Sequence, residues 1–503
     1  MVFEYGGIAK IKIPVKKSTI MAADEAGLIE IYAKYMDSCM SAHLLNADKE
    51  DYLYNFFLGS QDIKDKTRGF IGEIEQSDRN NRVVENHANA QVKFKVDFLL
   101  GDKMQFTHKT DTDSDDLTIF ERFLSDSGFY TEQRNIKQDM YAMGVGVSYT
   151  APDTDIINDD GTYSQDYDKD TQSPFLFSSV DPRKNFVVYS SYFGTKPLFC
   201  VSIVDNGDNT CDLIVNNGVY TFIYKNAGFP TNFSLPEIPD EIKVNGKLKD
   251  LPIIEHCYNK DRMGIVELNR DLFNMINLIV SNSGDAIVDT VNDILVFENV
   301  EVDKETIQEM RKGGAIKVKS SGDPNAQSKV YTLEVSLNHA DINVFYEQRV
   351  SKAYDIAGVP IASGVTTSGG DTGKARVLGG GWENAYNKIK GDIVGMEKTD
   401  TELLKSLLNI CHTVPDTRVD ELSASQIEIK YNINPNDNIL AKSQSASNLY
   451  NIGMPTDMIL TQTNLSMDVH SDGAKWQENI DKKQEMAMKK KDINGEDKDP
   501  KDE

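Results

Sequence analysis

The spacing of apolar residues predicts two helices in the first part of the chain. Between residues 20 and 60, apolar and acidic positions alternate with the period of an amphipathic helix. A second helix is predicted from Ser77 or Asn80, whose side chains suit an N-cap, to Gly101, which suits the left-handed residue after a helix. The apolar face that we expect for it holds Val83, Val84, His87, Ala90, Gln91, Phe94 and Phe98.

From residue 140 to 225 the pattern changes to that of β-strands. The runs FVVYSS, LFCVSIVD, CDLIVNNG and VYTFIY are rich in β-branched and aromatic residues, and the turn sequences DNGDN and NNG separate them. This pattern predicts an antiparallel meander. The run LPIIEHCY is expected to close the same region as one more strand.

Two long helices follow, with a small α/β unit between them. The first contains VELNRDLFNMINLIVSNSGDAIVDTVN, and its apolar stripe is thin. The second contains HADINVFYEQRVSKAYDIAG, and short strands around a helix over Lys304–Lys312 lie between the two. A long helix with a thin apolar stripe and polar flanks suits packing beside copies of itself. The polar flank of the first helix holds Asn269, Asn274, Asn277 and Asn282.

The last part of the chain is predicted to be helical, after a loop with the sequence GVPIASGVTTSGGDTGKARVLGG. One long helix, with possible kink sites at Gly391 and Gly395, leads to the strand IEIKYNINPND. Two or three short helices then reach about residue 486. The remaining tail is charged and poor in apolar residues, so we expect it to be disordered.

Composition and charge limit the classes of protein that remain. The chain has 503 residues, which indicates about three domains. Acidic residues outnumber Lys and Arg by 79 to 54, and the net charge of −25 argues against tight binding of nucleic acid, although such a chain can surround DNA without gripping it. The five cysteines are scattered and indicate free thiols. No signal peptide or membrane span is predicted, so we expect a soluble chain made in the cytoplasm.

The loop contains SGGDTGKA, which nearly matches a phosphate-binding loop. Gly373 and Lys374 fit that motif, but Ser368 stands at its first glycine and Ala375 stands where a hydroxyl must reach magnesium. A helix rather than a buried strand precedes the loop. An ATPase is therefore disfavoured. The loop's small hydroxyl side chains and its lysine suit brief contact with a phosphate backbone, and a plain surface loop remains the alternative.

Other candidate chemistry is weak, and we expect no catalytic, metal or cofactor site. The run DTDSDD lacks the glycine and glutamate of a calcium loop and fits an acidic start to a helix at Leu117. A zinc site is disfavoured because adjacent residues in a strand point to opposite faces. Its four candidate ligands are His256, Cys257, Cys411 and His412.

The order of these elements resembles that of portal proteins of long-tailed, siphovirus-type bacteriophages over residues of about 75 to 465. Three stretches carry the likeness: NNRVVENHANAQVKFKVDFLLGDKMQF, LPIIEHCYNKDRMGIVELNRDLFNMINLIVSNSGDAIVDTVNDILVF and GVPIASGVTTSGGDTGKARVLGGGWENAYNKI. Each is weak alone, and their order makes the match specific. The alternatives are another phage connector or tail protein and, less in keeping with the sequence, a P-loop-like ATPase.

The resemblance implies a non-enzymatic structural protein of the virion, assembled in the host cytoplasm. It would form a homo-oligomeric ring, a dodecamer, at one capsid vertex, and double-stranded DNA would pass through without sequence specificity during genome packaging and ejection. The implied partners are the large terminase, a head-completion adaptor at the head–tail connector, and the scaffolding and major capsid proteins. No membrane is involved.

The resemblance also implies an α+β multidomain portal fold that forms rings, with a wing of helices and antiparallel β-structure, a long-helix stem, an inserted α/β clip and a helical crown. The implied divisions are the N-terminal wing region 1–262, stem helix 263–287, clip 288–335, second stem helix 336–357, tunnel loop 358–374, wing helix and strand 375–437, crown 438–486 and acidic tail 487–503.

The resemblance also implies which residues form the functional sites, by their positions relative to the tunnel loop and the clip. The residues expected to face DNA from the tunnel loop are Val365, Thr366, Thr367, Ser368 and Lys374. The clip residues expected to dock the terminase or adaptor are Lys304, Glu305, Glu309, Arg311 and Lys312, for which a solvated helix face is the alternative.

Overall fold

A computed structural model gives the fold of the chain. It describes residues 6–66, 70–71, 74–75, 80–109, 115–154, 168, 172–207, 210–228, 233–246, 248–291, 294–298, 329–333, 339–361, 382–413, 419, 421–433, 439–463, 465 and 469–495.

The chain divides into two compact units. Unit 1 contains Met1–Asn55, Ala88–Leu268 and Ala357–Glu503, and unit 2 contains Phe56–His87 and Asn269–Ile356. The boundaries fall within helices, because the chain leaves and re-enters unit 1 along them. Among the described residues, no helix is both long and apolar enough to cross a membrane.

Unit 1 contains a six-stranded sheet that confirms the predicted meander. Four of its strands come from the four predicted runs, and β1 adds to one edge in parallel with β7. The alternating burial of β9 explains why the sequence pattern was readable, since one face is covered and the other is not. The strands in spatial order are β1 (Ile11–Ile13), β7 (Asn185–Ser190), β8 (Pro197–Asp205), β9 (Cys211–Asn216), β10 (Tyr220–Tyr224) and β11 (Glu241–Val244).

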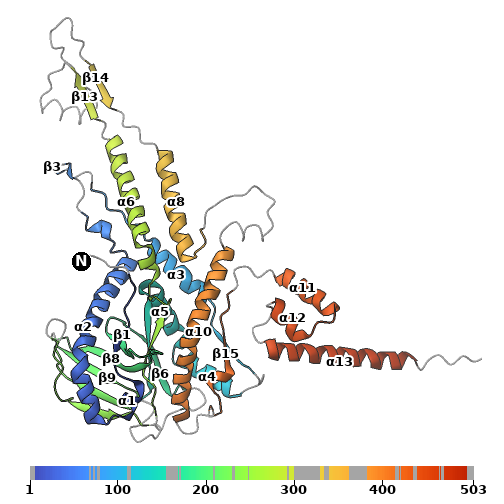
Figure 1. Ribbon diagram of the computed structural model, residues 1–503. Coiled ribbons are helices and arrows are strands. Elements are labelled where there is room, and N and C mark those ends of the chain that lie inside the picture. The colour runs from blue at the N-terminus through green and yellow to red at the C-terminus, as the bar shows by residue number, and fades with distance from the viewer. Residues whose placement is uncertain are drawn as a thin grey trace, which may run out of the picture. The chain divides into compact units, whose positions relative to one another are not determined.

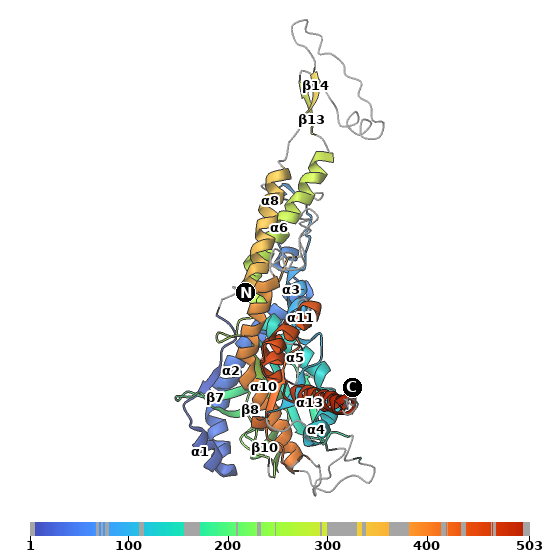
Figure 2. The same ribbon diagram turned by 90° about the vertical axis from the view of Figure 1, so that its right-hand side faces the viewer.

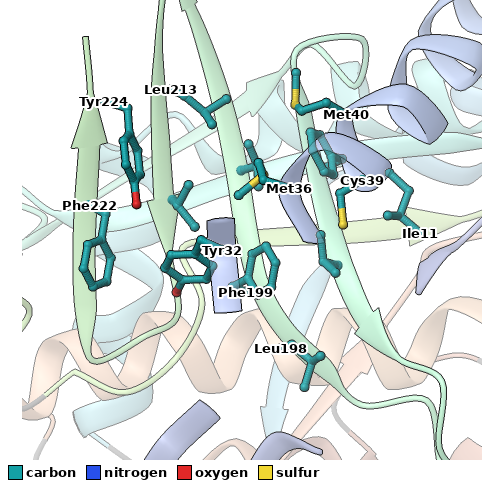
Figure 3. Packing of buried hydrophobic residues seen from close by; sticks show 14 of the residues in the cluster. Ile11, Tyr32, Met36, Cys39, Met40, Leu198, Phe199, Leu213, Phe222 and Tyr224 are labelled. Carbon is teal, nitrogen blue, oxygen red and sulfur yellow. The ribbon is translucent and has the colours of Figure 1, made fainter. Parts of the chain in front are cut away.

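Helix α2 (Glu25–Leu58) covers one face of this sheet and confirms the helix predicted between residues 20 and 60. At the centre of the core, the Tyr32 ring packs edge-on against Phe199 and Phe222, with centroid distances of 5.0 and 5.3 Å (Figure 3). The short helix α1 (Lys17–Ala22) adds Ile20 to the same core. Fully buried aromatic side chains of this size contribute ~1.5–3 kcal/mol each, so this core is the main source of stability for the sheet.

Unit 1 also contains a second sheet, of three strands, which the sequence pattern did not distinguish from the meander. The strand predicted at LPIIEHCY is confirmed as β12 (Ile253–Cys257). It does not join the meander but pairs with β5 (Val145–Pro152), which pairs with β6 (Phe175–Val180). Helices α5 (Phe129–Met143) and α10 (Trp382–Thr413) pack against this sheet. Strand pairing depends on partners far away in the chain, and alternation alone cannot show them.

Helix α3 (His87–Leu100) is shorter than predicted, and its buried face differs. Residues 80–86 have no helical structure, and Val83 is exposed, so the predicted start at Ser77 or Asn80 was wrong. The residues that are buried in α3 are Ala88, Gln91, Val92, Lys95, Val96, Leu99 and Leu100. The predicted helix at Leu117 is confirmed as α4 (Asp115–Asp126), which has two acidic residues in its first turn.

The remaining described elements of unit 1 lie near the C-terminus. Strand β15 (Ile427–Lys430) pairs with β4 (Gln105–His108), and the 3₁₀ turn η2 (Ala424–Gln426) precedes it. Three helices follow: α11 (Ile439–Asn451), α12 (Thr456–Thr463) and α13 (Val469–Gly495). The start of the predicted disordered tail was wrong, because α13 continues to Gly495.

Unit 2 is built on two long helices that run side by side (Figures 1 and 2). They are α6 (Ile265–Val291), which enters from unit 1, and α8 (His339–Ala357). Helix α6 extends four residues past the predicted end, into the range assigned to the inserted unit. Of that inserted unit, the structure describes an antiparallel pair, β13 (Ile294–Glu298) and β14 (Lys329–Leu333). Unit 2 also contains the 3₁₀ turn η1 (Asp62–Lys64) and the antiparallel strand pair β2 (Phe70–Ile71) and β3 (Ile74–Glu75).

Candidate functional site

The predicted tunnel loop joins two elements whose ends are well fixed in unit 1. After α8, Gly358 has a φ of +68°, and a Cβ at that position would lie 2.2 Å from Cδ of Lys388 on α10. Val359 is buried directly after it. The chain therefore leaves α8 through a left-handed residue that lies against the helix to which the loop returns.

The other end of the loop is held by aromatic packing. Trp382, the first residue of α10, lies 5.8 Å from the Phe94 ring and 6.0 Å from the Phe98 ring, and these two rings stack on each other. Phe94 and Phe98 were predicted as part of the apolar face of α3. They form a separate contact that fixes the start of α10.

Two buried lysines hold α10 along its length. Lys95 on α3 donates to Asp392 at 2.9 Å, and Lys137 on α5 donates to Asp400 at 2.7 Å. Both lysine side chains are essentially inaccessible to solvent, with exposed fractions of 1% and 0%. Buried charges of this kind persist only when paired, so these contacts set the register of α10 on its neighbours.

The two carboxylates differ in their electrostatic surroundings. Burial raises the pKa of Asp392, and Lys95 offsets only part of that effect. At Asp400 burial also acts to raise the pKa, but Lys137 and His256 outweigh it and hold the pKa well below its usual range. Asp400 is therefore a stable anion that also accepts a hydrogen bond from the Tyr431 hydroxyl at 2.5 Å.

Asp400 belongs to a cluster that has the order of a serine hydrolase triad. Ser148 Oγ lies 3.0 Å from His256 Nε2, and His256 Nδ1 lies 3.6 Å from Asp400 Oδ1. All three residues are buried, and Asp400 is already paired with Lys137. Since Ser148 lies in the middle of a core strand, a substrate could not reach it. The cluster is better explained as a polar contact inside the core, in which Ser148 pairs with His256 Nε2 while His256 Nδ1 lies near Asp400 without a hydrogen bond.

The four candidate zinc ligands are not brought together as a binding set. His256 faces Ser148 and Asp400, whereas His412 Nε2 interacts with the carbonyl of Val419 at 3.0 Å. Among the described residues, no group of His, Cys, Asp and Glu has the arrangement of a metal site. All five cysteines are free thiols, as predicted.

In unit 2, residues 80–86 form an extended strap along α6. The backbone amides of Asn81, Val83 and Glu85 donate to side chains of α6, at distances of 3.0, 3.0 and 2.9 Å. Their acceptors are Asp285, Ser281 and Asn277. Two residues of extended chain span ~6.6 Å and four residues of helix span ~6 Å, so the two repeats match and each step reaches the next turn.

The strap also reaches α8. Glu85 Oε2 accepts a hydrogen bond from the Tyr346 hydroxyl at 2.5 Å and lies 3.0 Å from His87 Nε2. His87 Nδ1 lies 3.2 Å from the Tyr354 hydroxyl. Strap contacts thus join α6 and α8 within unit 2. The sequence offered no direct signal for this, because the partners on α6 and α8 lie about two hundred positions or more from the strap in the chain.

The asparagines of α6 have a different role from the one predicted. Asn269 donates to the carbonyl of Ala353 on α8, Asn274 donates to Asp62, and Asn277 donates to Gln61. These contacts lie within one copy of the chain. The expectation that this polar flank faces neighbouring copies was therefore wrong for these three residues.

Several apolar side chains of α6 and α8 are exposed to solvent. A groove of about 470 Å³ lies between the two helices, and Ile279, Ile342 and Phe345 are among its lining residues with Asn282, Ser283 and Asp341. Further apolar side chains are exposed on the two helices: Met275 43%, Ile287 55%, Val344 54% and Ile356 43%. The helices of a protein that functions as a monomer rarely expose so many apolar side chains to solvent.

The residues predicted to touch DNA and partners lie outside the described part of the chain. This holds for Val365, Thr366, Thr367, Ser368 and Lys374 of the loop and for Lys304, Glu305, Glu309, Arg311 and Lys312 of the inserted unit. Their roles stay predictions. The sequence reading did not find Lys95 and Lys137, although each stands among apolar neighbours at helical spacing, which is a usable signal for a buried lysine.

Comparison with known proteins now identifies the class. The profile of the family "Phage portal protein, SPP1 Gp6-like" matches residues 37–489. This chain belongs to that family and is a phage portal protein, which confirms the resemblance seen in its sequence and the expectation of a structural, non-enzymatic component of the virion.

Solved structures give a more distant likeness. A chain in "Neck of native GTA particle computed with C12 symmetry" has 10% sequence identity and a TM-score of 0.40, with 76% of this chain and 91% of that chain covered. A chain in "Virion of native gene transfer agent (GTA) particle" has 10% identity and a TM-score of 0.38, with 75% and 89% covered. No curated protein sequence matches significantly.

Proposed function

We propose that the chain forms a closed ring of twelve copies at one vertex of the capsid, through which double-stranded DNA is packaged and ejected. The observation that carries this proposal is the open apolar groove between α6 and α8, together with the exposed apolar side chains around it. A ring needs one surface of each copy to fit a different surface of the next, and these helices supply apolar area for such a contact. In this proposal α6 and α8 are the stem.

A substitution in the groove tests ring formation. Phe345→Asp places a charge where a neighbouring copy is expected, and we expect the ring to be lost while the chain stays folded. Leu45→Asp is the matched control, because Leu45 is 75% exposed on α2 in unit 1. Native mass spectrometry with circular dichroism separates assembly from folding. Rings formed equally well by Phe345→Asp would contradict the proposed interface.

The proposed DNA contact is the loop 358–374, with Val365, Thr366, Thr367, Ser368 and Lys374 toward the channel. Its support is the close approach of Gly358 to Lys388 on α10, the packing of Trp382 at the start of α10 against α3, and the net charge of −25, which suits a conduit that does not hold DNA. We expect Lys374→Ala to change the amount of DNA packaged per particle. Lys398→Ala is a control, since Lys398 is an exposed lysine on α10. Equal packaging by both variants would count against the loop.

The inserted unit 288–335 is the proposed clip, which would dock the large terminase and later the head-completion adaptor. Its position in the chain between α6 and α8 supports this. Reversing the charges of Lys304, Arg311 and Lys312 should weaken terminase binding to the ring in a pull-down measurement, whereas Lys398→Glu should not. Unchanged binding would remove these residues from the docking surface.

The rest of unit 1 is proposed as wing and crown. The two sheets with α2, α3, α5 and α10 would form the wing, which faces the scaffolding and major capsid proteins. The helices α11 to α13 would form the crown. Sequence order and helix content support this division.

A further inference from the structure

A small cavity in unit 1 is lined in part by Ile8 and Ala9, in the segment that leads into β1. Polar side chains from three elements line it: Glu50 from α2, Glu255 from β12, and Arg262 from the turn before α6. His43 and Asn46 from α2 are also on its wall. The sequence suggested no polar site here, because the residues are spread over more than two hundred positions.

Two polar atoms of this cavity lack a hydrogen-bond partner among the described residues. They are Glu50 Oε2 and Arg262 Nε, and their residues are only 2% and 5% exposed. Nη1 of the same guanidinium donates to Glu255 Oε2 at 2.7 Å. A buried donor or acceptor left without a partner is unfavourable, because it has lost its hydrogen bonds to water, so a partner is expected for both.

The pair of atoms defines what that partner must be. Arg262 Nε–H is a donor, and the Glu50 carboxyl group is an acceptor when ionised and can also donate when protonated, so the partner that suits both states must be able to accept and to donate. A water molecule can accept from the first and donate to the second. The cavity has about 10 Å³ of room for the centre of a water-sized molecule, and one water needs ~10–15 Å³ of this kind of volume.

We propose that a single structural water molecule binds in this cavity, accepting a hydrogen bond from Arg262 Nε and donating one to the carboxyl group of Glu50. It links α2 to the turn that starts α6. The turn depends on such support, because Arg262 has a φ of 58° and its carbonyl accepts the amide of Ile8 at 3.1 Å.

The electrostatics of Glu50 fit a bound water. Burial raises its pKa to about 8, Arg262 and Arg183 act to lower it, and Glu255 and Asp181 act to raise it. His43, on the same wall, has its pKa lowered to about 4 by burial and is neutral at pH 7. A water molecule can reverse its donor and acceptor roles, so it can pair with Glu50 in either protonation state.

The direct test is a density map of the intact assembly at about 2 Å resolution, where ordered water is visible. We expect one isolated peak roughly 3 Å from both Glu50 and Arg262 Nε. A map in which Glu50 and Arg262 bond directly to each other, with no peak between them, would overturn the proposal.

A variant gives a second test. In Glu50→Leu the apolar side chain cannot hold the water, so the peak should vanish. At pH 4.5, where Glu50 in the folded protein is neutral, the melting temperature should fall by several degrees. Glu30→Leu is the control, because Glu30 is exposed on the same helix. If Glu50→Leu retained the peak, or melted no lower than Glu30→Leu, the water would not be a structural partner of Glu50. If Glu50→Leu failed to fold, the wild-type map would still decide.

Discussion

The two units hold their long helices in opposite ways. In unit 1, α10 packs into an apolar core, and its carboxylates pair with two fully buried lysines. In unit 2, α6 and α8 are joined through the strap by hydrogen bonds, some of which are accepted by the carboxylates of Asp285 and Glu85, and apolar side chains of both helices stay exposed. Unit 1 therefore has what an isolated domain needs, whereas unit 2 keeps apolar surface for a neighbour. A ring-forming chain needs both properties.

The largest effect is expected at a buried ion pair of unit 1. Lys137→Met leaves Asp400 as a buried charge without its main partner, and this should lower the free energy of unfolding by about 3–5 kcal/mol. Urea denaturation would measure it. The double variant Lys137→Met with Asp400→Leu should recover much of the loss, because the isolated charge is gone. A single variant as stable as wild type would show that the pair does not anchor α10.

The next effect depends on pH and comes from Glu50. Because burial raises its pKa from 4.5 to about 8 in the folded protein, the stability linked to this group is complete below pH 4.5 and is lost as pH rises toward 8. Glu50→Gln cannot ionise and should be more stable than wild type at pH 8 by roughly 4 kcal/mol, and similar at pH 4.5. Parallel stability curves for both proteins across this range would disprove the assignment.

In unit 2, the strap should be sensitive to single polar changes. Asn277→Ala removes the acceptor of the Glu85 amide and the donor to Gln61, so we expect a loss of about 1–3 kcal/mol. Hydrogen exchange at residues 80–86 should become faster, while exchange in the six-stranded sheet stays unchanged. Asn384→Ala, at an exposed site on α10, is the control. Unchanged hydrogen exchange at residues 80–86 would mean that the hydrogen bonds from the strap amides to the α6 side chains do not hold the strap in place.

The smallest effect is expected at Gly358, where α8 ends. Gly358→Ala must adopt a left-handed φ and displace the flexible Lys388 side chain, which should cost about 1–2 kcal/mol. A fall of a few degrees in melting temperature would agree. Gly391→Ala is the control, since a Cβ there meets nothing within 4 Å and the glycine lies inside a helix. That variant should be neutral or slightly more stable.

Much of the fold could be predicted from local patterns. The meander, α2, α10 and the two helices of unit 2 were readable because each buries one face at a regular period. Helix α10 passes through both Gly391 and Gly395 as one element. The strap was misread as helix because Val83 and Val84 fit the spacing, whereas its amides bond to α6 side chains about two hundred positions away. Local spacing carries no information on such partners.

The site was less predictable than the fold. The family could be identified from the order of elements, but the contacts that fix the loop ends depend on Trp382, Lys95 and Lys137 meeting partners on other helices. A polar residue in a sequence gives no sign of whether it will be buried in a pair or exposed to water. The exposed apolar groove likewise arises only when α6 and α8 are placed side by side.

Electron microscopy of the purified full chain tests the central claim most directly. The account predicts end-on views with twelve-fold symmetry, in which Ile279, Ile342 and Phe345 of each copy are covered by the next copy. Monomers at high concentration, or rings that leave this groove open to solvent, would contradict it.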